Sequence, residues 1–452
     1  MLKQIFFAFL FSISASSFAQ MPLSGFLSDD IFTEQPDTNE MVQDDLPVVE
    51  KLKYIKQPGL ANAASKIYSA DRNYSISGFL ELNNVNYLGK TDPDVVDQDL
   101  ELGYTGLYRL GLYFGYKFSD RWIFNSEVQA EFLHDGIRAT DGEFNLEVMM
   151  DYLWKTELSF RFGNFPMPLG YVNVMEEPTA FFTVNRPEVE RILIPTQWLE
   201  PGVMAYGKIF GTEYNIGVVK GLDATQFSEG AWIRPARYHW WENPQDLAGF
   251  LKFAYHDIKD LEVAAAGYYG TANRGHINPE SGDRINTSVG MATTYIDYTI
   301  GNVSLFGLGM YGWLNGTDDI AMVQRHRIMD PLQPIPVLGS ETYGGYAEIR
   351  WDILPILGKE TDQKLPLFFR YERLNTHGAV GFVPLERSSP VNPSVPSELN
   401  ETNITNLVFG INYRPARNIA IKANYTHRIN ESMYEKSNLQ PSRLEFGLGI
   451  IF

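Results

Sequence analysis

From Tyr74 onward, apolar and polar residues alternate with a period of two. Between Phe124 and Phe132, small or apolar side chains occupy every second position, and Asn, Glu and Gln occupy the positions between them. Such alternation predicts β-strands with one apolar and one polar face. Several of these segments exceed about 10 residues, whereas strands of soluble proteins average about 5–6 residues. A tilted strand needs about 9–11 residues to cross a bilayer, so the pattern favours membrane-spanning strands.

The alternation predicts sixteen strands whose connections are short and long in turn. Their approximate ranges are 74–88, 103–118, 121–133, 142–155, 157–164, 201–210, 213–222, 246–256, 260–270, 286–299, 302–313, 341–354, 366–375, 404–414, 418–429 and 442–452. Short turns such as 299–302 alternate with long connections such as 165–200. Short turns at one rim and long loops at the other are typical of an antiparallel transmembrane β-barrel. The fold class is therefore all-β.

One predicted strand has a particularly long apolar face. That face carries Tyr104, Gly106, Tyr108, Leu110, Leu112, Phe114, Tyr116 and Phe118, and the opposite face carries Thr105, Leu107, Arg109, Gly111, Tyr113, Gly115 and Lys117. Aromatic rings at both ends of an apolar band are typical of the two membrane interfaces.

The N-terminus predicts export. Lys3 precedes an apolar run from Ile5 to Ile13, and small residues up to Ala19 fit a signal-peptide cleavage site, so residues 1–19 are predicted to be removed. Residues 20–72 form an acidic segment with little periodicity, which we expect in the periplasm, and residues 73–452 form the barrel. Whether part of the acidic segment is helical or plugs the barrel stays open. The expected location is the bacterial outer membrane, in contact with lipid and lipopolysaccharide.

Composition excludes several classes of function. A net charge of −18 argues against a nucleic-acid partner, which would need clustered bases. The absence of cysteine excludes disulfides and thiolate sites. No histidine pair has the spacing of a catalytic zinc site, so we expect no enzyme activity and no cofactor. Asp92, Asp94, Asp97 and Asp99 are close enough in the sequence to ligate calcium, but they lack EF-hand spacing, and a solvated acidic loop tip is the default interpretation.

Three short motifs are Gly163-Asn164-Phe165-Pro166-Met167-Pro168-Leu169-Gly170, Phe369-Arg370-Tyr371-Glu372, and the hairpin from Asn412 to Tyr425. They resemble motifs of phosphate-selective porins of the O and P type. Pro166 stands where the family has lysine, and Leu169 where it has phenylalanine. The resemblance implies a homotrimeric diffusion channel whose third loop folds into the lumen. It also implies small hydrophilic solutes or ions as cargo, with anions such as phosphate among the candidates.

The connection at 165–200 is the predicted constriction loop. Its charged residues are Glu176, Glu177, Arg186, Glu188, Glu190 and Arg191. The predicted pore wall contains Arg109, Glu127, Glu131, Glu147, Asp151, Arg161, Arg350, Arg370, Glu372 and Lys422. Bases and acids balance on the predicted lumen face, so strong anion selectivity does not follow from the wall. Two alternatives remain: the connection is an extracellular flap, or the barrel is a plugged or adhesive structural protein.

Overall fold

The computed structural model describes ten stretches of the chain. They are residues 59–88, 103–132, 143–238, 246–327, 336–358, 363–383, 387–389, 392–395, 401–431 and 442–452. The predicted signal peptide, most of the acidic segment and the four aspartates of residues 92–99 lie outside the described residues. Their roles stay predictions.

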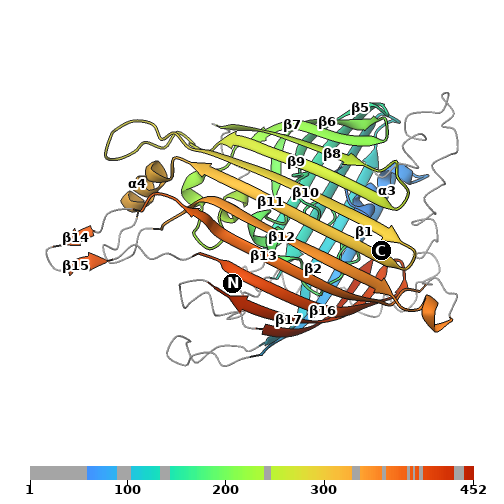
Figure 1. Cartoon of the computed structure of the whole chain (residues 1–452). Coiled ribbons are helices and arrows are strands. Elements are labelled where there is room, and N and C mark those ends of the chain that lie inside the picture. The colour runs from blue at the N-terminus through green and yellow to red at the C-terminus, as the bar shows by residue number, and fades with distance from the viewer. Residues whose placement is uncertain are drawn as a thin grey trace, which may run out of the picture. The chain divides into compact units, whose positions relative to one another are not determined.

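Sixteen antiparallel strands form a closed barrel (Figure 1). They are β1 (Tyr74–Leu88), β2 (Gly103–Lys117), β3 (Trp122–Glu131), β4 (Glu143–Lys155), β5 (Leu158–Pro166), β6 (Leu199–Ile209), β7 (Thr212–Lys220), β8 (Leu247–Tyr255), β9 (Leu261–Thr271), β10 (Ser288–Ile300), β11 (Val303–Asn315), β12 (Gly339–Asp352), β13 (Pro366–Val380), β16 (Asn403–Ala416), β17 (Ile419–Asn430) and β18 (Ser442–Ile451). β1 pairs with β18, from Phe79 opposite Ile451 to Leu88 opposite Ser442, and this pairing closes the ring.

The strand pattern predicted from the sequence is confirmed. All sixteen strands occur close to their expected ranges, and β13 pairs with β16 across the chain segment that contains a small separate hairpin. That hairpin consists of β14 (Arg387–Ser389) and β15 (Asn392–Val395).

The strands show the expected alternation of exposure. In β8, Leu251 and Phe253 are exposed, whereas Phe250 and Lys252 are buried. The exposed apolar side chains form the outer face that lipid covers, and polar and charged side chains turn inward.

A β-bulge in β2 makes the predicted face assignment wrong at one end. Glu81 of β1 pairs with Arg109, but Leu82 pairs with Leu107, so Tyr108 is the inserted residue. Tyr108 and Arg109 are consequently both buried, and Thr105 is exposed in place of Tyr104. An inserted residue reverses the alternation on one side of it, and a period of two read along one strand does not reveal it.

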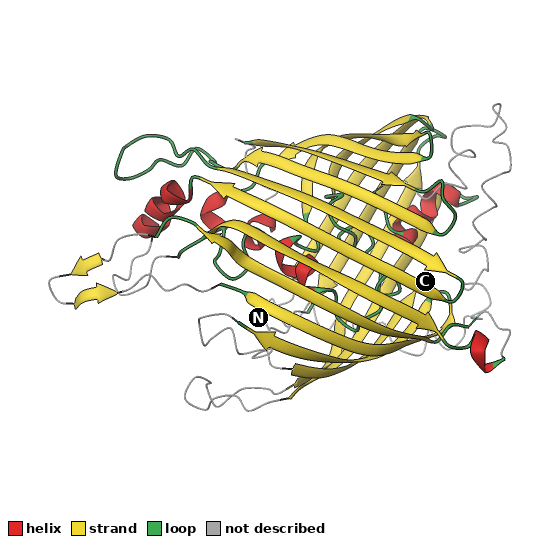
Figure 2. Cartoon of the chain, in the orientation of Figure 1, coloured by secondary structure: helices red, strands yellow, loops and turns green. Residues whose placement is uncertain are grey.

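Helix α3 (Asn62–Ser69) lies inside the ring of strands, against β1, β2 and β3 (Figure 2). Ser77 Oγ donates to the Ala63 carbonyl at 2.8 Å, and Asn125 Nδ2 donates to the Ala64 carbonyl at 2.6 Å. Ile67 is fully buried against Gly115, where an added Cβ would lie 2.4 Å from Ile67 Cβ. The last residues of the acidic segment therefore occupy the barrel interior.

Short helices lie in several of the connections between strands. They are η4 (Ala224–Gln226), η5 (Arg234–Tyr238), α4 (Thr317–Arg327) and, in a short connection, η6 (Pro355–Leu357). No helix in the described part of the chain has both the length and the apolar character needed to cross a lipid bilayer.

Candidate functional site

The connection between β5 and β6 folds into the barrel, as predicted. It contains the π-helical turn η3 (Val189–Leu193), and its apolar side chains are buried, with Met167, Leu169 and Val184 each fully inaccessible. The backbone N–H of Val184 donates to Asn424 Oδ1 of β17 at 2.7 Å. The loop therefore crosses the interior from β5 to the strands that close the ring, and it is not an extracellular flap.

The first two acidic residues of this loop contact the wall and the helix. Glu176 Oε1 accepts a hydrogen bond from Tyr113 at 3.0 Å, and its Oε2 accepts one from Gln129 at 2.9 Å. Glu177 accepts a hydrogen bond from the backbone N–H of Ala63, in the first turn of α3. The loop and the N-terminal helix thus form one packed unit inside the barrel.

Ion pairs fasten the middle of the loop to the wall. Arg186 pairs with Glu131 of β3, with both side chains buried. Glu188 lies between Arg428, at 2.8 Å, and Arg443, at 3.1 Å. Burial alone would raise the pKa of Glu188, but the two guanidinium groups outweigh it and hold this pKa below its ordinary value.

Near the end of the loop, Glu190 is held by hydrogen bonds from uncharged donors. Glu190 accepts hydrogen bonds from the Tyr346 hydroxyl and from the backbone N–H groups of Tyr171 and Val172, each at 2.6 Å. Burial raises the pKa of Glu190 despite these donors. Arg191 lies in η3 and is half-buried. The loop charges therefore serve to attach the loop.

All ten predicted wall residues are at most 8% exposed. Several pair with an opposite charge on a neighbouring strand: Arg109 with Glu81 at 2.7 Å, Arg161 with Asp151 at 2.8 Å, and Arg370 with Glu348 at 2.5 Å. Arg350 also contacts Glu348, Glu372 accepts from the Val189 N–H, and Lys422 donates to the Thr183 carbonyl. The structure brings these residues together, and their part in solute passage stays a prediction.

Two aromatic residues at the tip of the loop cover the basic part of the wall. The Phe182 ring lies 4.2 Å from the guanidinium carbon of Arg350 and 4.6 Å from that of Arg414. The Phe181 ring lies 3.9 Å from Lys422 Nζ. Cations stack favourably on aromatic faces. Neither ring was predicted as a site residue, although two adjacent phenylalanines in a proline-rich loop are visible in the sequence.

More accessible acidic groups line the short-turn end of β7, β9 and β10. The side chains of Glu213, Glu262 and Asp297 are 16%, 24% and 28% exposed. In ring order these strands lie across from β1, β2 and β3, which hold α3. Water therefore reaches these three carboxylates at the short-turn rim of the barrel.

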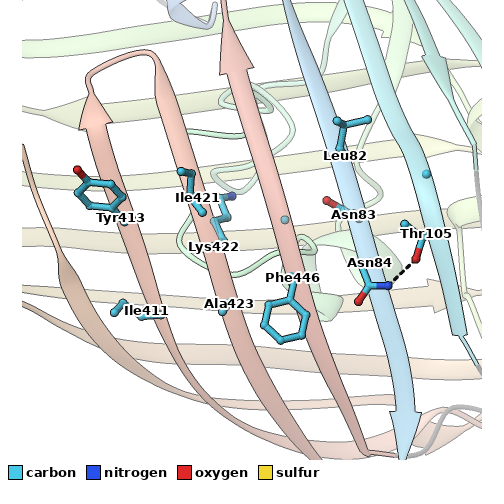
Figure 3. A pocket seen from close by; sticks show the side chains of 12 residues that line it. Leu82, Asn83, Asn84, Thr105, Ile411, Tyr413, Ile421, Lys422, Ala423 and Phe446 are labelled. Carbon is cyan, nitrogen blue, oxygen red and sulfur yellow. Dashed lines mark hydrogen bonds between the residues drawn. The ribbon is translucent and has the colours of Figure 1, made fainter.

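A groove of about 460 Å³ lies on the outer face of the closing strands (Figure 3). Exposed Leu82, Ile421 and Phe446 contribute to it. At its edge Asn84 donates a hydrogen bond to Thr105 (Figure 3), and Asn86 donates to Asn84 at 2.7 Å. Uncharged polar groups on the outward face thus satisfy one another.

The chain was compared with known proteins by sequence and by structure. No known protein family matches the sequence. An uncharacterised protein of Aquifex aeolicus is 28% identical over 386 residues, which covers 84% of this chain and 81% of that protein. The structure of Salmonella typhi OmpF in complex with daunomycin is similar with a TM-score of 0.52 at 10% identity, over 84% of this chain and 97% of that one. The outer-membrane channel DcaP of Acinetobacter baumannii gives a TM-score of 0.49 at 11% identity, over 84% and 97%.

Proposed function

We propose that this protein is an outer-membrane porin through which small hydrophilic solutes or ions diffuse down their gradients. The observation that carries the proposal is a closed sixteen-stranded barrel with an apolar outer face, a charged inner face and an inward-folded loop. The fold likeness to OmpF supports the class of protein. The protein needs no catalytic group for this function, because the loop and wall act only as a size and charge filter.

The solute preference follows from which charges water reaches. The carboxylates Glu213, Glu262 and Asp297 are partly exposed, whereas Lys422 and Arg350 are buried beneath Phe181 and Phe182. We therefore propose weak cation preference for the channel as folded. Phosphate and other anions, which the motif resemblance implies, become favoured only when the covered bases are accessible.

The test is single-channel recording of purified protein in planar bilayers, with reversal potentials measured in asymmetric salt. Stepwise conductance with a reversal potential on the cation side is expected. A membrane that stays silent at saturating protein excludes the open-channel proposal. A strongly anion-side reversal potential contradicts the charge argument while leaving the channel in place.

A plugged structural barrel is the second candidate, because α3 and the loop both occupy the interior. Liposome swelling in sugar solutions separates the two candidates. Swelling is expected for an open channel. Swelling only after α3 is displaced would identify a barrel that its own N-terminal segment closes.

We further propose that the chain is exported by cleavage after Ala19 and assembles as a homotrimer in contact with lipopolysaccharide. The outward-facing polar side chains of Asn84, Asn86 and Thr105 beside the groove support a protein-covered face, since polar side chains are disfavoured against lipid. N-terminal sequencing of the outer-membrane fraction tests cleavage. Native mass spectrometry in detergent, with and without Phe446→Arg, tests assembly, and a monomeric wild type would refute it.

A further inference from the structure

Three carboxylates from separate segments meet inside the barrel. Glu127 of β3 is directly opposite Glu147 of β4, and Glu176 reaches both from the constriction loop. One oxygen of each lies within 4.8 Å of one oxygen of the others. The three residues are 2%, 5% and 5% exposed, so little water separates their charges.

Nearby positive charge is insufficient for three carboxylates. Arg109 Nη1 lies 4.0 Å from Glu176 Oε2, but the same guanidinium already pairs with Glu81 at 2.7 Å. It also donates to the Glu176 backbone carbonyl at 2.8 Å. Carboxylates this close repel one another strongly in a buried setting unless a cation or a proton is shared between them.

A second observation points to a missing ligand. Glu127 Oε1 is buried and has no hydrogen-bond partner among the described residues. The two neighbouring donors, Tyr113 and Gln129, both donate to Glu176. Gly111 faces the same oxygen, and an added Cβ there would lie 2.7 Å from it. A buried carboxylate oxygen without a donor is costly, and a bound cation removes that cost.

We propose that Glu127, Glu147 and Glu176 bind a divalent cation, with calcium as the ion that fits best. Calcium binds oxygens at about 2.3–2.6 Å, so two of its ligands lie up to about 5 Å apart, which covers every separation below 4.8 Å. Magnesium, at about 2.0–2.1 Å, spans at most about 4.2 Å and so covers only the shorter part of the range below 4.8 Å. Three carboxylates offer up to six oxygens. The ion would join β3 and β4 to the constriction loop.

The site does not depend on whether solute passes through the barrel, so its test is a binding measurement. Purified protein in detergent is stripped with EDTA and titrated with Tb³⁺, with luminescence excited through tyrosine. The Tyr113 hydroxyl lies 3.0 Å from Glu176 Oε1, which makes Tyr113 the nearest sensitiser. Saturable emission that Ca²⁺ displaces more effectively than Mg²⁺ is expected, and Tyr113→Phe is expected to reduce the emission.

Glu147→Gln is the principal variant, and Glu200→Gln is its matched control. Affinity of calcium sites follows the number of charged ligands, so Glu147→Gln is expected to weaken displacement by Ca²⁺ by at least about tenfold. Glu200 is a buried carboxylate that pairs with Lys220 on β7, away from the three carboxylates, and Glu200→Gln should bind like the wild type. Equal Tb³⁺ binding by the wild type and Glu147→Gln overturns the proposal.

Thermal unfolding supplies a second measurement that needs no luminescence. Calcium should raise the unfolding temperature of the wild type above its value in EDTA. In EDTA, Glu147→Gln should be at least as stable as the wild type, because one repelling charge is gone, and calcium should no longer stabilise it. A wild type that calcium does not stabilise, with no saturable Tb³⁺ emission, overturns the proposal and leaves shared protons as the explanation. The wild-type measurement stands even where the variant fails to fold.

Discussion

Substituting Glu188 by glutamine should loosen the constriction loop. Glu188 is 2% exposed and contacts Arg428 with both carboxylate oxygens at 2.8 Å and Arg443 at 3.1 Å. At 2.8 Å and an effective dielectric constant of about 20, the attraction between Glu188 and Arg428 is about 6 kcal/mol before desolvation. Removing one partner of a buried pair costs about 3–5 kcal/mol, because the remaining charge stays buried. We expect Glu188→Gln to lower the free energy of unfolding by an amount of this order.

A double-mutant cycle isolates the contact. Glu188→Gln, Arg428→Gln and the double variant are unfolded by urea in detergent, and the coupling energy is expected to be about 2–3 kcal/mol. Asp297→Asn, which removes another carboxylate of the interior, is the control partner for Arg428→Gln and should give additive effects. A Glu188–Arg428 coupling below about 0.5 kcal/mol would refute the view that this contact holds the loop.

The same contact predicts how attachment depends on pH. The pKa of Glu188 is lower in the folded protein than in the unfolded chain, so its contribution is present above the unfolded value of about 4.3. It is lost only as pH falls through the lower folded value. The stability difference between the wild type and Glu188→Gln should therefore be equal at pH 7 and pH 5.5 and should shrink below about pH 4.

Three further changes test the remaining contacts. Gly115→Leu should displace α3, because an added Cβ would lie 2.4 Å from Ile67 Cβ, and should raise single-channel conductance; Gly309→Leu, where an added Cβ meets nothing within 4 Å, should not. Phe182→Ala should uncover Arg350 and Arg414 and shift the reversal potential toward anions, whereas Phe253→Ala on the outer face should leave it unchanged. Burial opposes ionisation of Asp223, but hydrogen bonds from Thr225 and the nearby His276 and Arg274 lower its pKa, so protease cleavage of the connection between β7 and β8 should increase as pH falls below about 4.

The strands were predictable because each carries its own signal. A period of two identifies a strand such as β8 without knowledge of its partners, and the long connection after β5 stood out by its length and its motif. The inward path of that loop followed from the resemblance. Its charged residues could be named from the sequence as a set, but their partners, such as Arg428 and Arg443 for Glu188, belong to strands about 240 residues or more away.

The contacts inside the barrel were not predictable either, because their partners lie far apart in the sequence. The position of α3 depends on Asn125 meeting the Ala64 carbonyl and on the missing side chain at Gly115, and neither marks the helix in its own sequence. Glu127 and Glu147 were predicted as wall residues and Glu176 as a loop residue. Their meeting depends on the register of Glu127 with Glu147 and on the loop path, which only tertiary structure determines.

The pairing of β1 with β18 also determines the order of assembly. The ring closes only when the last strand of the chain reaches the first, so every earlier intermediate has two unpaired edges. Helix α3 directly precedes β1, and the constriction loop contacts β17 and β18, so both must be inside when the final strand docks. Contacts this distant in sequence make folding slow. In the late step, the pairing of β18 with β1 therefore closes the barrel around α3 and the constriction loop, which are already in place.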